Sequence, residues 1–345
     1  MAKALALFSG GLDSILAVRL MLEQNVPVVA MHFVNGFGRS CSDGSAPPAV
    51  REAAQQLGVP LEVIDISGAF LELVKLPPHG YGSQMNPCID CRIQELRLAR
   101  QNMARFGADF VVTGEVVGQR PMSQRHFTLS LIEREAGVQG LVVRPLCARL
   151  LPPSQPEQRG WVDRARLLDI SGRSRKTQMA LARQFGITVY PTPAGGCLLT
   201  DPGFSARLRD LFAHKADADL NDVNLLKLGR HFRLSDRCKV VVGRDQDENP
   251  RLAALARRGD HLFELAFAPG PVGLLRGAAC PDGVQAAANI LVRYSKLRSE
   301  PEVKVFVWLA GSSERQVLCA RAPDAETIER LSVHTAAPSS SHPAE

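Results

Sequence analysis

Short apolar runs alternate with longer amphipathic stretches through the first half of the chain. ALALF has the continuous hydrophobicity of a strand that is buried on both faces. Similar runs predict five strands in all, at Ala4–Phe8, Pro27–Phe33, Leu61–Ile66, Asp109–Gly114 and Gly140–Leu146. Helical periodicity separates or follows them at Leu12–Glu23, Ala49–Leu57, Ile89–Phe106 and Lys176–Phe185. Strands alternating with helices in this way predict an α/β fold with a doubly wound, mostly parallel sheet.

The pattern changes after about Ser205. The segments KVVVG, HLFELAF, GLLRG, KVFVWLA and RQVLCARA are typical of strands, and a helix is expected at about Gly283–Ser295. Ser312–Glu314 is the expected hairpin turn between the last two strands. We therefore predict a first domain over residues 1–204, a smaller α+β domain over 205–332, and a disordered low-complexity tail over 333–345.

Composition narrows the class of protein. The 345 residues are 45% hydrophobic, which is enough for two cores. A net charge of +6 leans towards a polyanionic partner, and residues 207–321 hold 19 Lys or Arg against 14 Asp or Glu. No apolar stretch is long enough to span a membrane, and MAKALALFSGG is too short an apolar run for a signal peptide. With eight cysteines, the chain is expected to be cytoplasmic, where metal binding or catalysis outranks structural disulfides.

FSGGLDS joins the first predicted strand to the first helix. In this position, backbone N–H groups and a helix N-terminus bind phosphate. Gly10 and Gly11 would let the backbone close on an anion, Ser9 and Ser14 add hydroxyl donors, and Asp13 could hold Mg²⁺. No GK[ST] follows, so this is not a Walker-type loop. The alternative is an ordinary turn between a strand and a helix.

SGGLDS resembles the pyrophosphate (PP) loop of the ATP pyrophosphatase superfamily, whose fold is HUP-like. The resemblance implies that ATP is cleaved between its α and β phosphates with Mg²⁺, that a carbonyl oxygen is adenylated, and that a nucleophile then displaces AMP. It also implies that Ser9, Gly10, Gly11, Asp13 and Ser14 bind ATP.

TGEVVGQRPMSQ, after the fourth predicted strand, is similar to a stretch of the 4-thiouridine synthase group of tRNA sulfurtransferases, as is RPL at Arg144–Leu146. The resemblance places Gly114 and Gln119 near ATP and lets Glu115 assist with Mg²⁺. The spacer before Ser123 and Gln124 is one residue longer than in that group. For Gln119 and Gln124 the alternative is hydrogen bonding within the loop.

Three cysteines are candidates for sulfur chemistry: Cys88 and Cys91 in NPCIDC, and Cys197 in GGCLLTD. Three thiolates suit an iron–sulfur cluster with one open iron, and some tRNA thiolases resembling this chain hold a [4Fe–4S] cluster in this way. A persulfide relay needs only two sulfurs, and a zinc site would need a fourth ligand such as His79 or Cys147. His79 could instead contact substrate. The remaining cysteines, Cys41, Cys238, Cys280 and Cys319, are expected to be buried and free.

The segment that contains VVGRDQDEN is similar to the NFACT-type RNA-binding domain. Four arginines are candidates for phosphate contacts, namely Arg230, Arg233, Arg244 and Arg251, with a solvated basic face as the alternative. Tyr and Trp together number five in the chain. We therefore expect recognition of folded RNA by its shape and backbone rather than a ladder of stacked bases.

Together these features predict an ATP-dependent tRNA sulfurtransferase with Asp13, Cys88, Cys91 and Cys197 as catalytic residues. Its partners would be tRNA and an external donor of sulfide or persulfide, and a homodimer is compatible with the sequence. One alternative is a PP-loop enzyme that adenylates a small molecule. The other is a non-catalytic RNA-binding or iron–sulfur protein.

Overall fold

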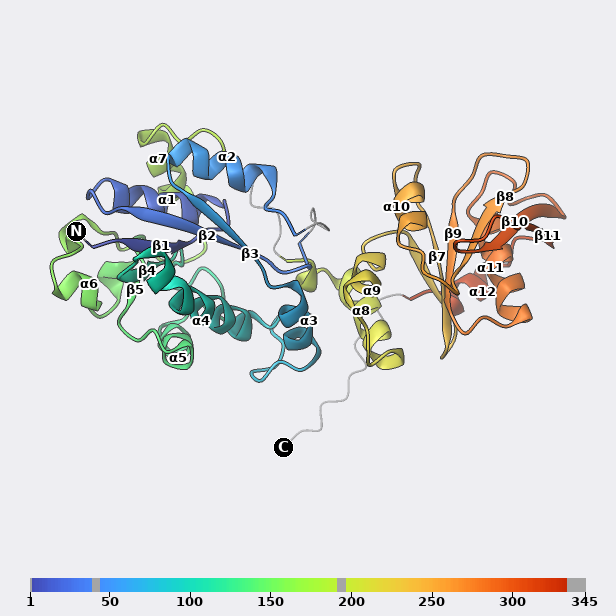
Figure 1. Cartoon of the computed structure of the whole chain (residues 1–345), viewed down its shortest axis with the longest axis horizontal. Helices are drawn as coiled ribbons and strands as arrows, with labels where there is room; N and C mark the ends of the chain where they lie inside the picture. The colour runs from blue at the N-terminus through green and yellow to red at the C-terminus, as the bar shows by residue number, and fades with distance from the viewer. Residues whose placement is uncertain (1, 39–43, 191–196, 334–345) are drawn as a thin grey trace. The chain divides into compact units, whose positions relative to one another are not determined.

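The computed structural model describes residues 2–38, 44–190 and 197–333, and it divides into two compact units, Met1–Thr200 and Asp201–Glu345 (Figure 1). Helix α8 (Pro202–His214) opens the second unit, and the side chain of Asp201 caps it by accepting a hydrogen bond from the backbone N–H of Phe204. The expected disordered tail falls almost wholly outside the described residues. No described helix is long and apolar enough to cross a membrane.

Unit 1 is built on a five-stranded sheet in the order β3-β2-β1-β4-β5. All four strand pairings are parallel. The strands are β1 (Ala4–Leu7), β2 (Val28–Val34), β3 (Leu61–Asp65), β4 (Phe110–Val112) and β5 (Val142–Val143). This arrangement confirms the predicted doubly wound α/β fold, although β5 is much shorter than the apolar run that predicted it.

Helices cover both faces of this sheet (Figure 1). One core lies against α1 (Leu12–Leu22), α2 (Pro48–Leu57) and α7 (Lys176–Gln184), and a second lies against α4 (Cys88–Phe106) and α5 (His126–Ala136). Helices α3 (Ser67–Lys75) and α5 were not predicted. The remaining helical segments are short, namely α6 (Gln155–Gln158) and the 3₁₀ turns Ala148–Leu150, Arg164–Arg166 and Leu198–Thr200.

Unit 2 contains a six-stranded antiparallel sheet in the order β11-β10-β8-β9-β7-β6, with α11 (Pro281–Arg293) packed on one face. The strands are β6 (Arg230–Ser235), β7 (Cys238–Val242), β8 (His261–Leu265), β9 (Gly273–Gly277), β10 (Val303–Leu309) and β11 (Gln316–Ala320). The other helices are α8, α9 (Leu220–Leu225), α10 (Glu248–Ala254) and α12 (Ala325–Leu331). The pairing of β10 with β11 confirms the predicted final hairpin. Strand β6 was not predicted.

The order of strands in unit 1 reverses between β1 and β4, which lie side by side. Ligands of open α/β sheets bind at such a switch point, outside the carboxyl ends of the strands. The loop after β4 approaches the loop after β1 very closely. A Cβ atom on Gly114 would lie 2.6 Å from the backbone of Asp13 and Ser14, so only glycine fits without moving backbone.

We expect Gly114→Ala to lower the free energy of unfolding of unit 1 by about 1–3 kcal/mol, because the added methyl group meets backbone that cannot rotate away. The matched control is Gly68→Ala in α3, where a Cβ atom meets nothing within 4 Å. Urea unfolding followed by the fluorescence of Trp161, in a Trp308→Phe background, measures both. Equal stability of the two variants would contradict the close contact.

The sheet of unit 2 places three cations in a row. Lys239 on β7 pairs directly with Arg233 on β6 and with Arg276 on β9. Like charges directly opposite one another destabilise a sheet, so carboxylates must offset them. Asp210 accepts two hydrogen bonds from Arg233, at 2.9 and 2.6 Å, and Asp260 accepts from Arg276. Lys239 is only 5% exposed, and burial lowers its pKa to about 8 although Asp210 opposes the shift.

This buried lysine makes the stability of unit 2 depend on pH. Its pKa is about 8 in the folded chain and about 10.5 in a solvated one, so between these values the unfolded chain binds more protons. We expect the free energy of unfolding to rise by up to about 3 kcal/mol across that window, and to be insensitive to this group below it. The measurement is urea unfolding followed by Trp308 fluorescence in a Trp161→Phe background. Lys239→Met should remove the slope, and an unchanged slope in that variant would contradict the assignment.

Candidate functional site

The loop between β1 and α1 turns on Gly10, whose φ of +72° lies in the left-handed region that favours glycine. Hydroxyl groups hold the turn. Ser14 Oγ donates to the carbonyl of Gly11 at 2.8 Å, and the N–H of Gly11 donates to Ser9 Oγ at 3.3 Å. Gly11 is the N-cap of α1, so the first N–H groups of an eleven-residue helix face the end of this loop. Such an end favours a negatively charged group.

Asp13 lies in the first turn of α1 and faces two other segments. Its Oδ2 accepts a hydrogen bond from Gln119 Nε2 at 3.1 Å and lies 3.9 Å from Arg175 Nη2. Its Oδ1 is buried and has no hydrogen-bond partner among the described residues. A buried carboxylate oxygen without a partner is suited to Mg²⁺ or to another ligand group. The structure therefore brings Asp13, Gly114 and Gln119 together, as the sequence reasoning required.

Helix α7 contributes two residues that sequence reasoning missed. Arg175, at its N-terminus, has a buried Nε without a hydrogen-bond partner among the described residues, and both polar atoms of Gln178 are in the same state. Gln178 is 0% exposed and lies one turn further along the same face. The sequence did contain a signal for Gln178. It is a polar residue on the same face of an amphipathic helix as Leu181, Ala182 and Phe185. Buried polar groups of this kind fit a site that is completed by a ligand.

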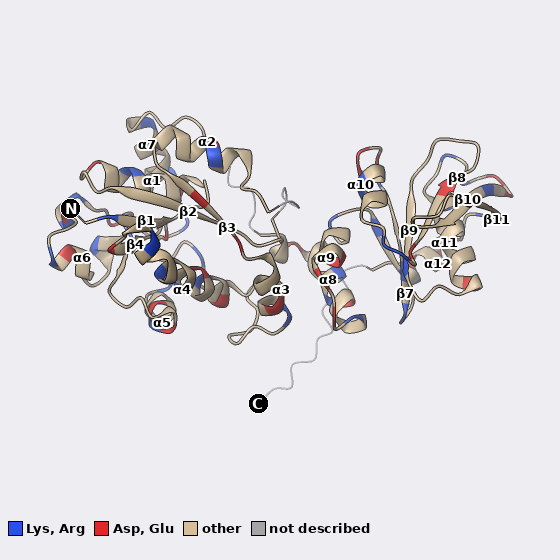
Figure 2. Ribbon diagram, in the orientation of Figure 1, with Lys and Arg blue, Asp and Glu red and all other residues tan. Residues whose placement is uncertain are grey.

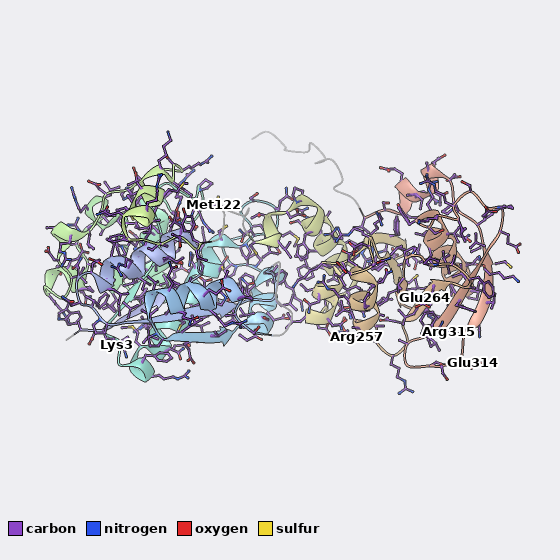
Figure 3. All side chains as sticks on the ribbon, turned by 90° about the horizontal axis from the view of Figure 1, so that it is seen from above. Lys3, Met122, Arg257, Glu264, Glu314 and Arg315 are labelled. Carbon is purple, nitrogen blue, oxygen red and sulfur yellow. The ribbon has the colours of Figure 1, made fainter. Side chains whose placement is uncertain are left out.

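The loop after β4 connects this corner to the cysteines. Gln124 is buried and closes the loop. Its side-chain oxygen accepts from the N–H of Arg120 at 3.1 Å, and its carbonyl accepts from Gly118 at 2.7 Å. Gln124 therefore hydrogen-bonds within the loop. Further along, a Cβ atom on Gly82 would lie 3.3 Å from Met122 and 3.6 Å from Cys88 Sγ, so the far end of the loop lies close to the cysteines (Met122 is labelled in Figure 3).

Glu115 was expected to assist with Mg²⁺, but the structure engages it elsewhere. Its carboxylate is 1% exposed, accepts from Arg144 Nε at 3.0 Å and from Thr113 Oγ1 at 3.1 Å, and lies 3.4 Å from Arg92 Nε. Burial alone would raise the pKa of Glu115, but Arg144 and Arg92 outweigh it, so the pKa is lowered. Glu115 is therefore a carboxylate that holds the loop to β5 and α4. Arg144, in the segment Arg144–Leu146, has the same structural role because it pairs with Glu115.

The three candidate cysteines lie near one another. Cys88 and Cys91 form the first turn of α4, and the loop before them is tied to the segment after Cys197 by a hydrogen bond from Met85 N–H to the Leu199 carbonyl at 3.1 Å. Burial is the main cause of a raised pKa at all three thiols, and the neighbouring Cys88 also raises the pKa of Cys91 and of Cys197. Arg120 opposes this rise at Cys88 and at Cys197.

No group of three or more His, Cys, Asp or Glu side chains within the described ranges converges as a metal site. The two residues named as a fourth zinc ligand are both engaged elsewhere. His79 Nδ1 pairs with Asp90 at 2.7 Å and its Nε2 with Glu135 at 3.3 Å, and Cys147 is buried with Sγ donating to the Glu115 carbonyl. His79 therefore anchors its loop to α4, and Asp90 raises the pKa of His79.

The other cysteines differ from expectation in part. Cys238 is buried, as predicted, but Cys280 and Cys319 are exposed, so that part of the prediction is wrong. Each lies where a run of small or apolar residues meets the surface, Cys280 as the N-cap of α11 and Cys319 on the edge strand β11. Cys41 lies outside the described residues.

The four arginines proposed for RNA contact lie in different environments. Arg233 is held by Asp210, Arg244 forms an ion pair with Glu248, and Arg230 stacks over Tyr294 with its Cζ 4.7 Å from the ring centroid. Arg251 is exposed on α10. Of the four, Arg251 and the half-exposed Arg244 are therefore the most accessible to a phosphate group.

One aromatic cluster was not foreseen from the small number of Tyr and Trp residues. Phe267 contacts Phe306 on β10, with ring centroids 6.0 Å apart. Arg315 lies over both Phe306 and Trp308, and its Nη1 is 3.4 Å from Glu264 (Glu264 and Arg315 are labelled in Figure 3). Because Arg315 already covers these rings, the cluster does not offer an open ladder for bases.

Comparison with known proteins supports both halves of the sequence reasoning. The family model described as thiamine biosynthesis protein (ThiI) matches residues 1–149, and the model described as NFACT protein RNA binding domain matches residues 229–331. The first range contains the PP loop, Cys88, Cys91 and the loop after β4. The second contains all six strands of the unit 2 sheet.

The chain is similar to curated tRNA-specific 2-thiouridylases MnmA. The relative from Syntrophotalea carbinolica is 33% identical over 32% of this chain and 33% of its own length, and the relative from Thermosynechococcus vestitus is 26% identical over 65% and 59%. The chain thus spans about a third to three-fifths of the length of these relatives.

The chain is also similar to the crystal structure of a 4-thiouridine synthetase–RNA complex with bound ATP. The two are 21% identical over 54% of this chain and 41% of that chain, with a TM-score of 0.37. The resemblance of unit 1 to the PP-loop, ThiI-type family, and of unit 2 to the NFACT RNA-binding domain, is thereby confirmed in sequence.

Proposed function

We propose that this protein is an ATP-dependent tRNA sulfurtransferase, which adenylates a nucleobase carbonyl and replaces its oxygen with sulfur. One observation supports this most directly. The loop after β4 hydrogen-bonds to Asp13 of the PP loop through Gln119, and its next residue, Arg120, acts electrostatically on Cys88 and Cys197. The corner that we propose to bind phosphate therefore lies at one end of a short loop, and a group of thiols lies near its other end. The matches to ThiI and to 2-thiouridylases favour the same reaction.

At the phosphate-binding corner, the loop Ser9–Ser14 and the N-terminus of α1 would bind the phosphates of ATP. The turn at Gly10 directs backbone N–H groups at the anion, and Asp13 Oδ1 would hold Mg²⁺. Gln119 and Arg175 hold the other oxygen of Asp13, which fixes the orientation of that carboxylate. Charge that develops on the departing pyrophosphate would then be stabilised by donors that are already in place.

At the other side of the loop, Cys88, Cys91 and Cys197 would hold an iron–sulfur cluster. The chemistry of the donors suits such a group, because three partly buried thiols lie near one another and both candidate fourth ligands are engaged elsewhere, although the described side chains do not converge as a metal site in this structure. When bound, a [4Fe–4S] cluster with three protein ligands would leave one iron able to bind a sulfide. The chain's own contribution is to shield the thiols partly from water and to bring the charge of Arg120 to act on Cys88 and Cys197.

The reaction has two steps. The carbonyl oxygen of the base attacks the α-phosphorus of ATP, and pyrophosphate leaves. The carbon that carried the oxygen is then attacked by sulfur, and AMP leaves with that oxygen. Sulfide from outside the protein completes this step directly. If a persulfide carrier supplies the sulfur, its outer sulfur attacks the carbon, a thiol then breaks the S–S bond to release the thiocarbonyl, and an external reductant must reduce the disulfide that forms. Unit 2 would bind the RNA through its basic surface, including Arg244 and Arg251, while unit 1 performs the chemistry.

The first test concerns Asp13. We expect Asp13→Asn to keep the fold but to reduce tRNA-dependent pyrophosphate release by about 10²–10³-fold, because the substitution removes the charge that would hold Mg²⁺. The matched control is Asp169→Asn, at an exposed residue paired with Arg149. In cells, mass spectrometry of tRNA nucleosides should show one thionucleoside lost with the gene and restored by Asp169→Asn but not by Asp13→Asn.

Two outcomes would contradict the proposal. Pyrophosphate release that needs no RNA, with all thionucleosides unchanged, would favour adenylation of a small molecule. RNA binding without any pyrophosphate release would favour a non-catalytic protein.

The second test concerns the thiols. Wild-type protein purified without oxygen should contain iron and acid-labile sulfide, and Cys197→Ala should lose most of both because two thiols cannot hold a cluster alone. Cys280→Ala, at an exposed cysteine of unit 2, is the control and should keep both. Freshly prepared wild-type protein that contains zinc instead, or no metal, would rule out the cluster.

A further inference from the structure

Unit 2 contains a cavity of about 350 Å³ that the proposed reaction does not use. It lies between helices α8 and α9 and strands β6, β7 and β9. The helices precede the segment that matches the RNA-binding family, which begins at residue 229, whereas the strands belong to it. The cavity is therefore formed where this chain's own helical segment packs on the family's sheet. Its volume is at the lower end of the range of small-ligand sites.

Cations dominate the wall of this cavity. Its charged lining residues are five Lys or Arg against two Asp, namely Lys215, Arg233, Arg237, Lys239, Arg276, Asp222 and Asp236, and His214 also lines it. Figure 2 shows Lys and Arg in blue along the strands around β7. Most of these cations already have partners. Asp210 holds Arg233, while Asp222 accepts from Lys215 at 2.7 Å and from Arg276 at 3.0 Å.

Lys239 and Arg237 are the exceptions. The Nζ of Lys239 is buried and makes no hydrogen bond to any described residue, and its ion-pair contact with Asp210 is long, at 3.7 Å. Asp210 also already accepts hydrogen bonds from Nε and Nη2 of Arg233. A buried ammonium group without hydrogen bonds is costly, and a bound anion would satisfy it. Arg237, which is exposed at the rim, adds a second cation whose guanidinium forms no ion pair with the described residues.

The rest of the lining is apolar. Leu211 and Leu225 come from the two helices, and Ala278 follows β9. A ligand that suits this cavity therefore combines an anionic group with a flat or apolar part of modest size. A nucleoside monophosphate has both, and inorganic phosphate has only the first.

We propose that this cavity binds one nucleoside monophosphate unit, with its phosphate on Lys239 and Arg237 and its nucleoside against Leu211 and Leu225. The unit is either a free nucleotide or an unpaired or terminal nucleotide of an RNA chain. In the second case, the inference rests on the RNA binding proposed for unit 2. The site would then hold a single nucleotide of the RNA at a defined place, which an exposed basic surface cannot do.

The experiment uses the full chain, titrated by calorimetry with each of the four nucleoside 5′-monophosphates, with inorganic phosphate, and with an unmodified tRNA transcript. We expect a monophosphate to bind more tightly than inorganic phosphate. Lys239→Met and Arg237→Ala should each weaken that binding by at least about tenfold, which is the loss of one charge-assisted contact. The matched control is Arg298→Ala, an exposed arginine that does not line the cavity.

Competition between monophosphates and tRNA shows whether the occupant is a free nucleotide or a nucleotide of the RNA. If monophosphates displace tRNA, and both variants weaken tRNA binding, the occupant is a nucleotide of the RNA. If monophosphates bind without displacing tRNA, it is a free nucleotide. The inference is overturned if no monophosphate binds, or if both variants bind every probe as Arg298→Ala does. Pyrophosphate release by Asp13→Asn is read separately, so a failure of the proposed reaction is distinguishable from a failure of this site.

Discussion

The close packing of Gly114 on the backbone of Asp13 and Ser14 is the contact on which the geometry of unit 1 depends. Parallel strands β1 and β4 lie side by side, so the loops that follow them leave the same edge of the sheet. Because residue 114 has no side chain, the second loop lies directly on the first. Gln119 can then reach Asp13, and the same loop continues to Arg120 and Met122 beside the cysteines. The absence of a side chain at residue 114 thus allows the close approach of the loop after β4 to the loop between β1 and α1.

Both units contain buried polar atoms that have no hydrogen-bond partner among the described residues, some of them where a ligand is proposed. In unit 1 these are Asp13 Oδ1, Arg175 Nε and the amide of Gln178, and in unit 2 the atom is Lys239 Nζ. Folded proteins rarely leave such groups unsatisfied, because each costs stability. Departures from this rule concentrate at functional sites, where a ligand completes the hydrogen bonding. Glu115 differs because cations of its own unit neutralise it: Oε2 accepts from Arg144, and Oε1, which accepts no hydrogen bond from a described residue, lies 3.4 Å from Arg92 Nε.

Particular elements show how far the sequence alone leads. The strands of the unit 1 sheet and helices α1, α2, α4 and α7 follow from continuous apolar runs and helical periodicity, because that sheet is buried on both faces. Strand β6 was missed because only Phe232 and Leu234 of its six residues are apolar, and an alternation of two residues among charged neighbours is too short to detect. Arg175 was missed because its contact with Asp13 joins residues that are 162 positions apart.

The sequence by itself determined the α/β class of unit 1, the glycine loop after β1, the spacing of Cys88 and Cys91, and the resemblance of each unit to a family, since these depend on local patterns of residues. Tertiary structure decided which polar residues remain available for a ligand. It placed Arg175 beside Asp13 of the PP loop, buried Gln178 on α7, bound Glu115, His79 and Arg233 to partners, and aligned Arg233, Lys239 and Arg276 across three strands. The physical reason is that an ionic group's role depends on the charges that surround it in space, and the register of a sheet and the packing of helices choose those neighbours from distant parts of the chain.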